Sequence, residues 1–243
     1  MLLSSSQGDR KGCAVLSYPR RGMHGEVVED LGRRILGGDP DAGGTLDPTA
    51  LARHYGVSHT VMREAMKTLA AKGLVDARPK RGTFVRPRAE WSMLDPDVLR
   101  WRFTQRGDEG MLRDLAEVRA VVEPAGARLA AKRRTDEDLE VLETALARMA
   151  DTVSDPVTHT EADIAFHRAL LAAARNEVLD CLQVVIAAAL YARDRLVHAG
   201  GERTGFAATH RAVLDAVRRA DPDAAESAMR DLLAQAGKDE AAI

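Results

Sequence analysis

The sequence contains little cysteine, few aromatic residues and no long apolar run, and each shortage excludes a class of protein. Two cysteines, Cys13 and Cys181, provide neither a disulfide framework nor a zinc-finger spacing, which is typical of a reducing cytoplasm. No apolar stretch approaches the roughly 20 residues that span a membrane. The residues that follow Leu3 are too polar for a secretory signal. We therefore expect a cytoplasmic protein that has no membrane partner.

Aromatic residues make up only 4% of the 243 residues, whereas hydrophobic residues as a whole make up 45%. Alanine and leucine dominate, which favours helices, and the length suffices for two ordinary domains. Residues 1–90 carry 15 basic and 10 acidic side chains, a net charge of +5, and residues 91–243 carry 20 and 27, a net charge of −7. This asymmetry indicates that only the N-terminal part binds nucleic acid.

Residues 51–88 have the pattern of a winged helix-turn-helix. A tight turn at 56–58 separates two helices, and Ser58 can cap the second of them. Apolar residues recur at helical spacing along this second helix, and Gly73 would end it as a C′ glycine. A polar face remains that could enter a DNA major groove. Its candidate contacts are Ser58, His59, Thr60, Arg63 and Lys67.

The wing would consist of two short strands, at 74–77 and 83–85, joined by a turn. Its tip, Lys80-Arg81-Gly82, can reach the DNA backbone or the minor groove. The whole winged region holds nine Lys or Arg and two Asp or Glu, a net charge of +7 that suits phosphate binding. The alternatives are a small α/β module with an exposed basic turn and a helix-turn-helix that binds protein.

Composition sets the expected domain boundaries. Residues 1–19 lack any period and are expected to form a disordered tail. The DNA-binding domain would occupy residues 20–88, and a linker with a docking helix would occupy residues 89–107. Because free linkers seldom carry large apolar residues, the segment 86–95 is expected to dock on the second domain. Residues 108–243 should form an all-α antiparallel bundle of six or seven helices, so the protein as a whole is mainly α with a small β wing.

The second domain contains a candidate metal site. Asp163 and His167 lie four residues apart, so both point from one helix face. A carboxylate and an imidazole in this arrangement can share a divalent cation, with His210 as a third candidate. The alternative is a salt bridge or a solvated face. His159, a further turn upstream of Asp163, is expected toward the exposed end of the helix.

Arg119 lies beside the apolar stripe of another expected helix, and a buried arginine needs an anion. The anion is either Glu123, four residues further on, or the carboxylate of a ligand, which a planar guanidinium suits. Asn176 is expected to cap a helix that continues through His198, and it is also a candidate for contact with the ligand.

The run GVSHTVMREAMKTLAAKGLVDARPKRGTFV resembles the GntR-family signature, in which a recognition helix leads into a glycine-tipped wing. The resemblance implies DNA contacts from Arg63 and from the wing tip at Gly82. His59 stands where the family usually has arginine, and TLDPTALA replaces the usual LPSE-x-x-LA run. Because arginine suits bidentate contact with guanine, the change at His59 bears on the operator sequence and on the affinity.

Residues 108–236 resemble the FCD ligand-binding domain of FadR-subfamily GntR regulators, through EVRAVVEPAGARLAA, EADIAFHRALLAAARNEVL and THRAVLDAVRRADPDAAESAMRDLL. That family binds a metal through an Asp and three His and contacts a carboxylate effector through an arginine. The matching residues are Asp163, His167 and His210 for the metal and Arg119 for the effector. Leu232 stands at the position of the last histidine. Three ligands can still hold zinc if water or the effector completes the shell. A weak, effector-assisted or absent metal is the alternative.

The segment AEWSMLDPDVLRWRF, 89–103, resembles DgoR-like members, which repress sugar-acid catabolism genes and respond to aldonates. This resemblance makes Arg102 a second candidate anion contact, against the alternative of an exposed arginine on a surface helix. We therefore expect a homodimeric repressor that binds double-stranded operator DNA and is released by a small carboxylate or sugar acid. The competing hypotheses are a metal-dependent enzyme that uses the Asp/His cluster and a DNA-binding architectural protein without an effector.

Overall fold

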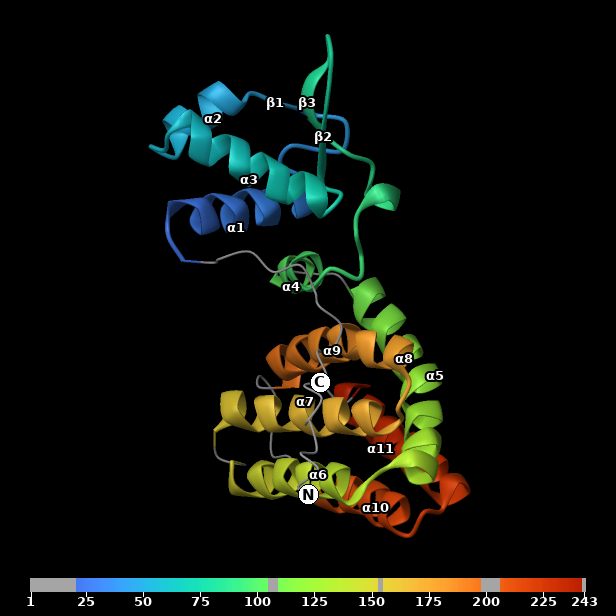
Figure 1. The fold of residues 1–243 in the computed structure, drawn as a ribbon. Coiled ribbons are helices and arrows are strands. Elements are labelled where there is room, and N and C mark those ends of the chain that lie inside the picture. Colours follow the sequence, from blue (N-terminus) through green and yellow to red (C-terminus); the bar gives the residue numbers. More distant parts are fainter. Residues whose placement is uncertain (1–20, 105–108, 153–154, 198–205, 242–243) are drawn as a thin grey trace, which may run out of the picture. The chain divides into compact units, whose positions relative to one another are not determined.

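The computed structural model describes residues 21–104, 109–152, 155–197 and 206–241. Within these ranges the chain forms two compact units (Figure 1). The first contains the described residues of 21–116 together with 187–193, and the second contains those of 117–186 and 194–241. The first unit carries a small sheet, whereas the described part of the second is helical, as expected from its composition.

Three helices and a three-stranded sheet of the N-terminal unit together form the winged helix-turn-helix. These elements are α1 (Met23–Leu36), β1 (Thr45–Leu46), α2 (Pro48–His54), α3 (His59–Ala71), β2 (Val75–Arg78) and β3 (Gly82–Val85). The strand order is β1-β3-β2, with both pairs antiparallel. Strand β1 was not expected, because two residues are too short to show an alternating pattern. Asp47 caps the start of α2, since its carboxylate accepts a hydrogen bond from Thr49 N–H at 2.8 Å.

Helix α3 begins and ends as its sequence predicts. The Ser58 hydroxyl accepts a hydrogen bond from Val61 N–H at 3.2 Å and caps the first turn. Gly73 follows the helix with φ of 74°, the left-handed conformation of a C′ glycine. The buried residues of α3 recur at helical spacing and pack on the core of the unit; they are Met62, Ala65, Met66 and Leu69.

The segment after the wing packs on the N-terminal unit. A 3-10 helix η1 (Arg88–Glu90) precedes α4 (Pro96–Thr104), and α4 lies against α1. Trp91 and Trp101 are buried in the same core cluster as α1 and α3. A Cβ on Gly32 of α1 would lie 2.5 Å from the Trp101 ring, so only glycine permits this contact. The expectation that this segment docks on the second domain is therefore wrong for Trp91, because the winged-helix core offers it an apolar surface.

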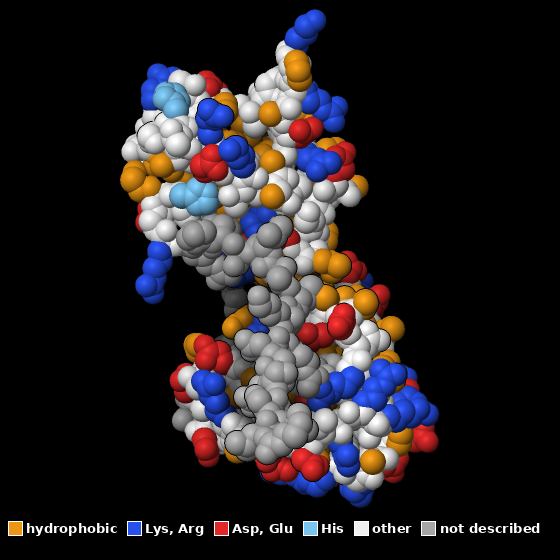
Figure 2. Space-filling view, viewed as in Figure 1, with side chains coloured by type: hydrophobic (Ala, Val, Ile, Leu, Met, Phe, Trp, Pro, Cys, Tyr) orange, Lys and Arg blue, Asp and Glu red, His pale blue; other side chains and the backbone are white. Residues whose placement is uncertain are grey.

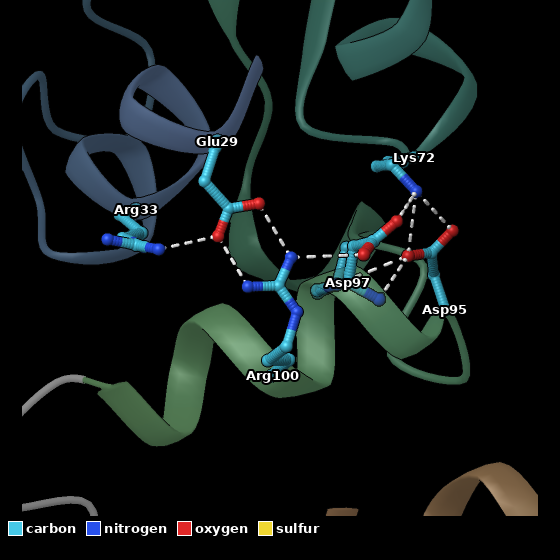
Figure 3. A network of polar contacts seen from close by, with 7 residues as sticks. Glu29, Arg33, Lys72, Asp95, Asp97 and Arg100 are labelled. Carbon is cyan, nitrogen blue, oxygen red and sulfur yellow. Dashed lines mark hydrogen bonds and ion pairs between the residues drawn. The ribbon is translucent and has the colours of Figure 1, made fainter. Parts of the chain in front are cut away.

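A buried network of charges ties α4 to α1 and to the end of α3 (Figure 3). Lys72, whose side chain is 4% exposed, lies 3.0 Å from Asp95 and 2.8 Å from Asp97. Arg100 donates to Asp97 at 3.1 Å and to Glu29 of α1 at 2.6 Å. Because buried charges require partners, this network makes α4 an integral part of the N-terminal unit.

The remaining helices are α5 (Glu109–Arg133), α6 (Asp136–Asp151), α7 (Pro156–Ala173), α8 (Glu177–Cys181), α9 (Gln183–Val197), α10 (Phe206–Arg218) and α11 (Pro222–Ala241). Helix α6 begins with a capping box, in which Thr135 and Asp138 form reciprocal hydrogen bonds. The single helix expected after Asn176 is instead two helices, α8 and α9, and His198 lies outside the described residues.

Helix α7 packs against α6, and α10 packs against both α6 and α11 (Figure 1). The apolar residues of these helices form one core, which includes Leu146, Phe166, Leu214 and Leu232. Among the described residues, no helix combines the length and the apolarity that crossing a membrane requires.

Candidate functional sites

Helix α3 exposes the polar side chains predicted to read DNA. Ser58, His59, Thr60, Arg63 and Lys67 are all exposed, opposite the buried stripe of the helix. Lys67 pairs with Glu64 at 2.8 Å, and this hydrogen bond lowers the pKa of Glu64. The face therefore carries hydroxyl, imidazole and cationic groups that can meet base edges and phosphates.

The wing projects a second set of cations. Arg81 and Gly82 are exposed at its tip, as the sequence predicts, beside Lys80. Lys80 and Gly82 have φ of 67° and 75°, so the turn between β2 and β3 uses left-handed backbone at both positions. Figure 2 shows Lys and Arg side chains on the visible face of this unit, one of them extended from the end of the wing. Such a basic projection suits the DNA backbone.

The C-terminal unit brings Asp163, His167 and His210 to one point, as predicted. Asp163 Oδ1 lies 3.3 Å from His167 Nε2 on the same helix and 3.0 Å from His210 Nε2 on α10. All three side chains are buried, and each offers a ligand atom within 4.8 Å of the others. The geometry therefore joins one carboxylate and two imidazoles in a single cluster.

Contacts of the two imidazoles with oxygen atoms outside this cluster orient the rings, so that Nε2 of each faces into the cluster. His210 Nδ1 lies 2.8 Å from the Phe206 carbonyl oxygen, and His167 Nδ1 contacts the Glu123 carboxylate. With a metal bound, each imidazole would keep its proton on Nδ1, toward these oxygens, and would offer its Nε2 lone pair to the metal beside Asp163. Partners of this kind orient the histidines of metal sites. The donor set fits a divalent metal such as zinc, which accepts nitrogen and carboxylate oxygen.

The ionisable groups in and beside the cluster shift one another's pKa values. Burial alone would raise the pKa of Glu123, but Arg119 and His167 lower this pKa to about 2. Burial alone would also raise the pKa of Asp163, yet hydrogen bonds from His167 and His210 hold it well below its usual range. Burial would lower the pKa of His167, whereas Glu123 and Asp163 together raise it to about 9. Glu123 and Asp163 therefore stabilise a positive charge on His167, which both of them contact.

Arg119 is buried, and its Nε donates to Glu123 at 2.5 Å, so the internal salt bridge considered as an alternative is present. The other oxygen of Glu123 contacts His167, and Glu123 thereby links Arg119 to the Asp–His cluster. A Cβ on Gly126 would lie 2.6 Å from Leu171 Cδ2, so the Leu171 side chain of α7 packs against α5 at this glycine. Sequence reasoning paired Glu123 only with Arg119, because contact between two helices leaves no local pattern.

Two further candidate residues have structural partners of their own. Arg102 is half-buried on α4 of the N-terminal unit, with its guanidinium 3.8 Å from the Met93 sulfur. The Asn176 side-chain oxygen accepts hydrogen bonds from Val178 N–H and Leu179 N–H and caps α8. Contact of Arg102 or Asn176 with an effector remains a prediction.

The expected exposure of His159 is wrong. Its side chain is buried, its Nδ1 lies 3.1 Å from the Met149 carbonyl oxygen, and its ring meets Phe206 edge-on. The carbonyl at the end of α6 provides a polar partner that the spacing along α7 could not reveal. Leu232, where the resemblance to FCD domains predicts a histidine, is buried in the apolar core.

Comparisons with known proteins place both units in one family. Residues 24–85 match the profile of the bacterial regulatory proteins of the gntR family, and residues 114–235 match the FCD domain. The chain is also 36% identical over 215 residues to the galactonate operon transcriptional repressor of Escherichia coli, covering 86% of this chain and 92% of that protein. The chain belongs to the GntR family. It is a DNA-binding transcriptional regulator with a C-terminal FCD domain.

Two further proteins resemble this regulator, one in sequence and one in fold. It is 31% identical over 223 residues to the putative L-lactate dehydrogenase operon regulatory protein of Escherichia coli, covering 88% of this chain and 84% of that protein. A solved structure of Lar, which controls expression of the Listeria monocytogenes agr system, matches with a TM-score of 0.64 at 17% identity. This match covers 93% of this chain and 100% of Lar and shows that the two share a fold.

Proposed function

We propose that this regulator is a homodimeric repressor of genes for sugar-acid catabolism, released from its operator by an aldonate-like carboxylate. The observation that carries the effector assignment is the continuous buried chain of contacts from Arg119 through Glu123 to His167, Asp163 and His210. The Arg119 guanidinium then lies at one end of this chain of contacts, and the proposed metal site lies at the other. The name of the Escherichia coli relative, a galactonate operon repressor, favours a sugar acid as the ligand.

The operator side of the proposal rests on α3 and the wing. Arg63 and its exposed neighbours on α3 would enter the major groove, while Arg81 and Gly82 would meet the backbone or the minor groove. Because one winged helix reads only a short site, two copies related by a twofold axis would read a palindrome. Light scattering of the full-length protein at micromolar concentration should report a dimer, and a monomer alone would contradict this part of the proposal. Binding to operator DNA implies a cytoplasmic location.

The effector side follows from the chemistry of a hydroxy acid. Asp163, His167 and His210 would hold a divalent metal such as zinc, which accepts these donors, and the metal would act as a Lewis acid toward hydroxyl or carboxylate oxygens. The carboxylate of the ligand would pair with Arg119, in competition with Glu123. Such an exchange would favour one arrangement of the bundle and alter the spacing of the two winged helices.

Calorimetry of D-galactonate binding, before and after removal of metal by a chelator, tests the site directly. If the acid is itself a metal ligand, each must strengthen the binding of the other by the same factor. We expect a loss of affinity on chelation and recovery with zinc. Equal affinities would show that the Asp–His cluster is not part of the effector site. Absence of binding with zinc present would reject the sugar-acid assignment.

Two controls complete this experiment. Arg63→Ala alters only the exposed face of α3 and should leave the binding of the acid unchanged. Incubation of the zinc-loaded protein with the acid, followed by product analysis, tests the enzyme hypothesis. We expect no turnover, because a regulator needs only reversible binding, and conversion of the acid would favour a catalytic role for the cluster.

A further inference from the structure

Phe84 is buried on the face of the wing that points away from the core. Strand residues alternate between the two faces of a sheet. Val75 and Val85 form a cross-strand pair and both belong to the hydrophobic core of the N-terminal unit. Phe84 is paired with Asp76 on the opposite face, and yet it is only 3% exposed. A buried aromatic ring outside the core cluster requires another cover.

Two arginines provide this cover. The guanidinium carbon of Arg81 lies 3.5 Å from the centroid of the Phe84 ring, and that of Arg78 lies 5.6 Å from it. Arg78 stands opposite Gly82 in the β2–β3 pair and is also bound to Asp76 at 3.1 Å. Guanidinium groups stack on aromatic faces because they are planar, weakly hydrated cations. The close Arg81 contact is a stack of this kind.

Stacking matters for Arg81 because its side chain is otherwise exposed at the wing tip. An unrestrained arginine samples many rotamers, and the loss of this freedom opposes binding. A ring that supports one face of the guanidinium restricts these rotamers before DNA arrives, while the N–H groups at the edge remain available for a phosphate or a base. The wing thus contains a pre-oriented cation.

We propose that Phe84 is a positioning residue for operator binding, which holds the Arg81 guanidinium in the orientation in which the wing meets DNA. This proposal rests on the proposed contact between Arg81 and the operator. Phe84 itself touches no DNA and acts through Arg81. Exchange of its ring for an aliphatic side chain of similar size should therefore weaken binding only while Arg81 is present.

A double-mutant cycle on the full-length protein tests this dependence. The probe is a duplex that the wild-type protein selects from a random-sequence DNA pool, and affinity is measured by fluorescence anisotropy. Arg81→Ala should weaken binding about tenfold, and Phe84→Leu about three- to tenfold. In the Arg81→Ala background, Phe84→Leu should have no further effect. In the Arg63→Ala background it should have its full effect, because distant sites are independent.

Two variants separate positioning from folding. Phe84→Tyr keeps the ring and should retain wild-type affinity. Arg81→Lys keeps the charge but lacks the planar group and leaves Phe84 in place; it should weaken binding, and Phe84→Leu should add nothing to it. Thermal melts identify any variant that does not fold, and Arg81→Lys then carries the test because its side chain is exposed.

The outcomes separate the operator contact of Arg81 from the positioning role of Phe84. If Arg81→Ala leaves the affinity unchanged, the proposed operator contact of Arg81 fails, and the role of Phe84 fails with it. If Arg81→Ala weakens binding but Phe84→Leu weakens it equally in both backgrounds, the operator contact stands. In that case Phe84 acts through the fold of the wing, and the positioning role is overturned.

Discussion

The Glu123 carboxylate contacts Nδ1 of His167, and this contact joins the buried arginine of α5 to the Asp–His cluster of α7 and α10. Glu123 therefore has two partners of positive charge rather than one. The arrangement resembles the carboxylate–histidine–metal relays in which an outer carboxylate sets the tautomer and basicity of a ligand. It also makes Arg119 and the metal ligands a single electrostatic unit.

Replacement of Glu123 by glutamine should weaken zinc binding by about 10–100-fold, because the outer partner of His167 loses its charge. Competition with a chelating dye measures this affinity in the purified protein. Glu117→Gln, at an exposed position of the same helix, is the matched control and should bind zinc normally. Equal zinc affinity in wild type and Glu123→Gln would mean that Glu123 serves Arg119 alone.

Leu232→His should tighten zinc binding, because it restores a fourth protein ligand at the position that carries histidine in the family. Without metal the same substitution should lower the melting temperature, since a polar ring would replace a side chain that is 4% exposed in the core. Differential scanning with and without zinc measures both effects. A variant whose melting temperature does not respond to zinc more than wild type would remove Leu232 from the ligand shell.

Arg63→Ala should weaken operator binding by roughly 1–3 kcal/mol without changing the fold, because Arg63 is exposed on the reading face of α3. A gel-shift titration at fixed salt concentration gives the affinity, and circular dichroism checks the helix content. The effect should depend on base sequence, whereas the loss of a phosphate contact would weaken all duplexes alike. Unchanged affinity would exclude Arg63 from the DNA contacts.

Lys72→Ala should destabilise the protein by about 3–5 kcal/mol, because it removes the buried cation that Asp95 and Asp97 share and leaves Asp97 paired only with Arg100. Arg33 pairs with Glu29 at the exposed end of the same network, and Arg33→Ala should have little effect. Urea denaturation of both variants measures the difference. Similar stabilities for the two variants would show that burial of the Lys72 pair does not hold α4 on the N-terminal unit.

Lys80→Gly should weaken operator binding and lower the slope of affinity against salt by about one, since one wing cation is lost. Its stability should be unchanged or slightly higher. Release of left-handed strain at φ of 67° contributes about 1 kcal/mol, and the greater backbone freedom of glycine opposes it. Ala220→Gly makes the same backbone change at φ of 54° in the C-terminal unit and should leave operator binding intact. An unaltered salt slope in Lys80→Gly would rule out a phosphate contact.

The reading helix and its cap could be predicted from sequence because they depend on near neighbours. Ser58 caps the helix that it precedes, and Gly73 adopts the left-handed conformation that ends it. The pair of Asp163 and His167 also follows from helical spacing, since residues four apart share a face. Each of these features requires only hydrogen bonds or side-chain directions within one or two turns of helix.

The structure alone decided which separate elements meet. His210 reaches Asp163 because α7 and α10 both pack against α6, and Glu123 and His167 meet from two separate helices, α5 and α7. The docking of Trp91 on the winged helix reversed the expectation from sequence that its segment docks on the second domain. The periodicity of apolar residues predicts which side chains are buried. The residues that cover them depend on how helices distant in sequence pack together, and no local sequence pattern encodes this packing.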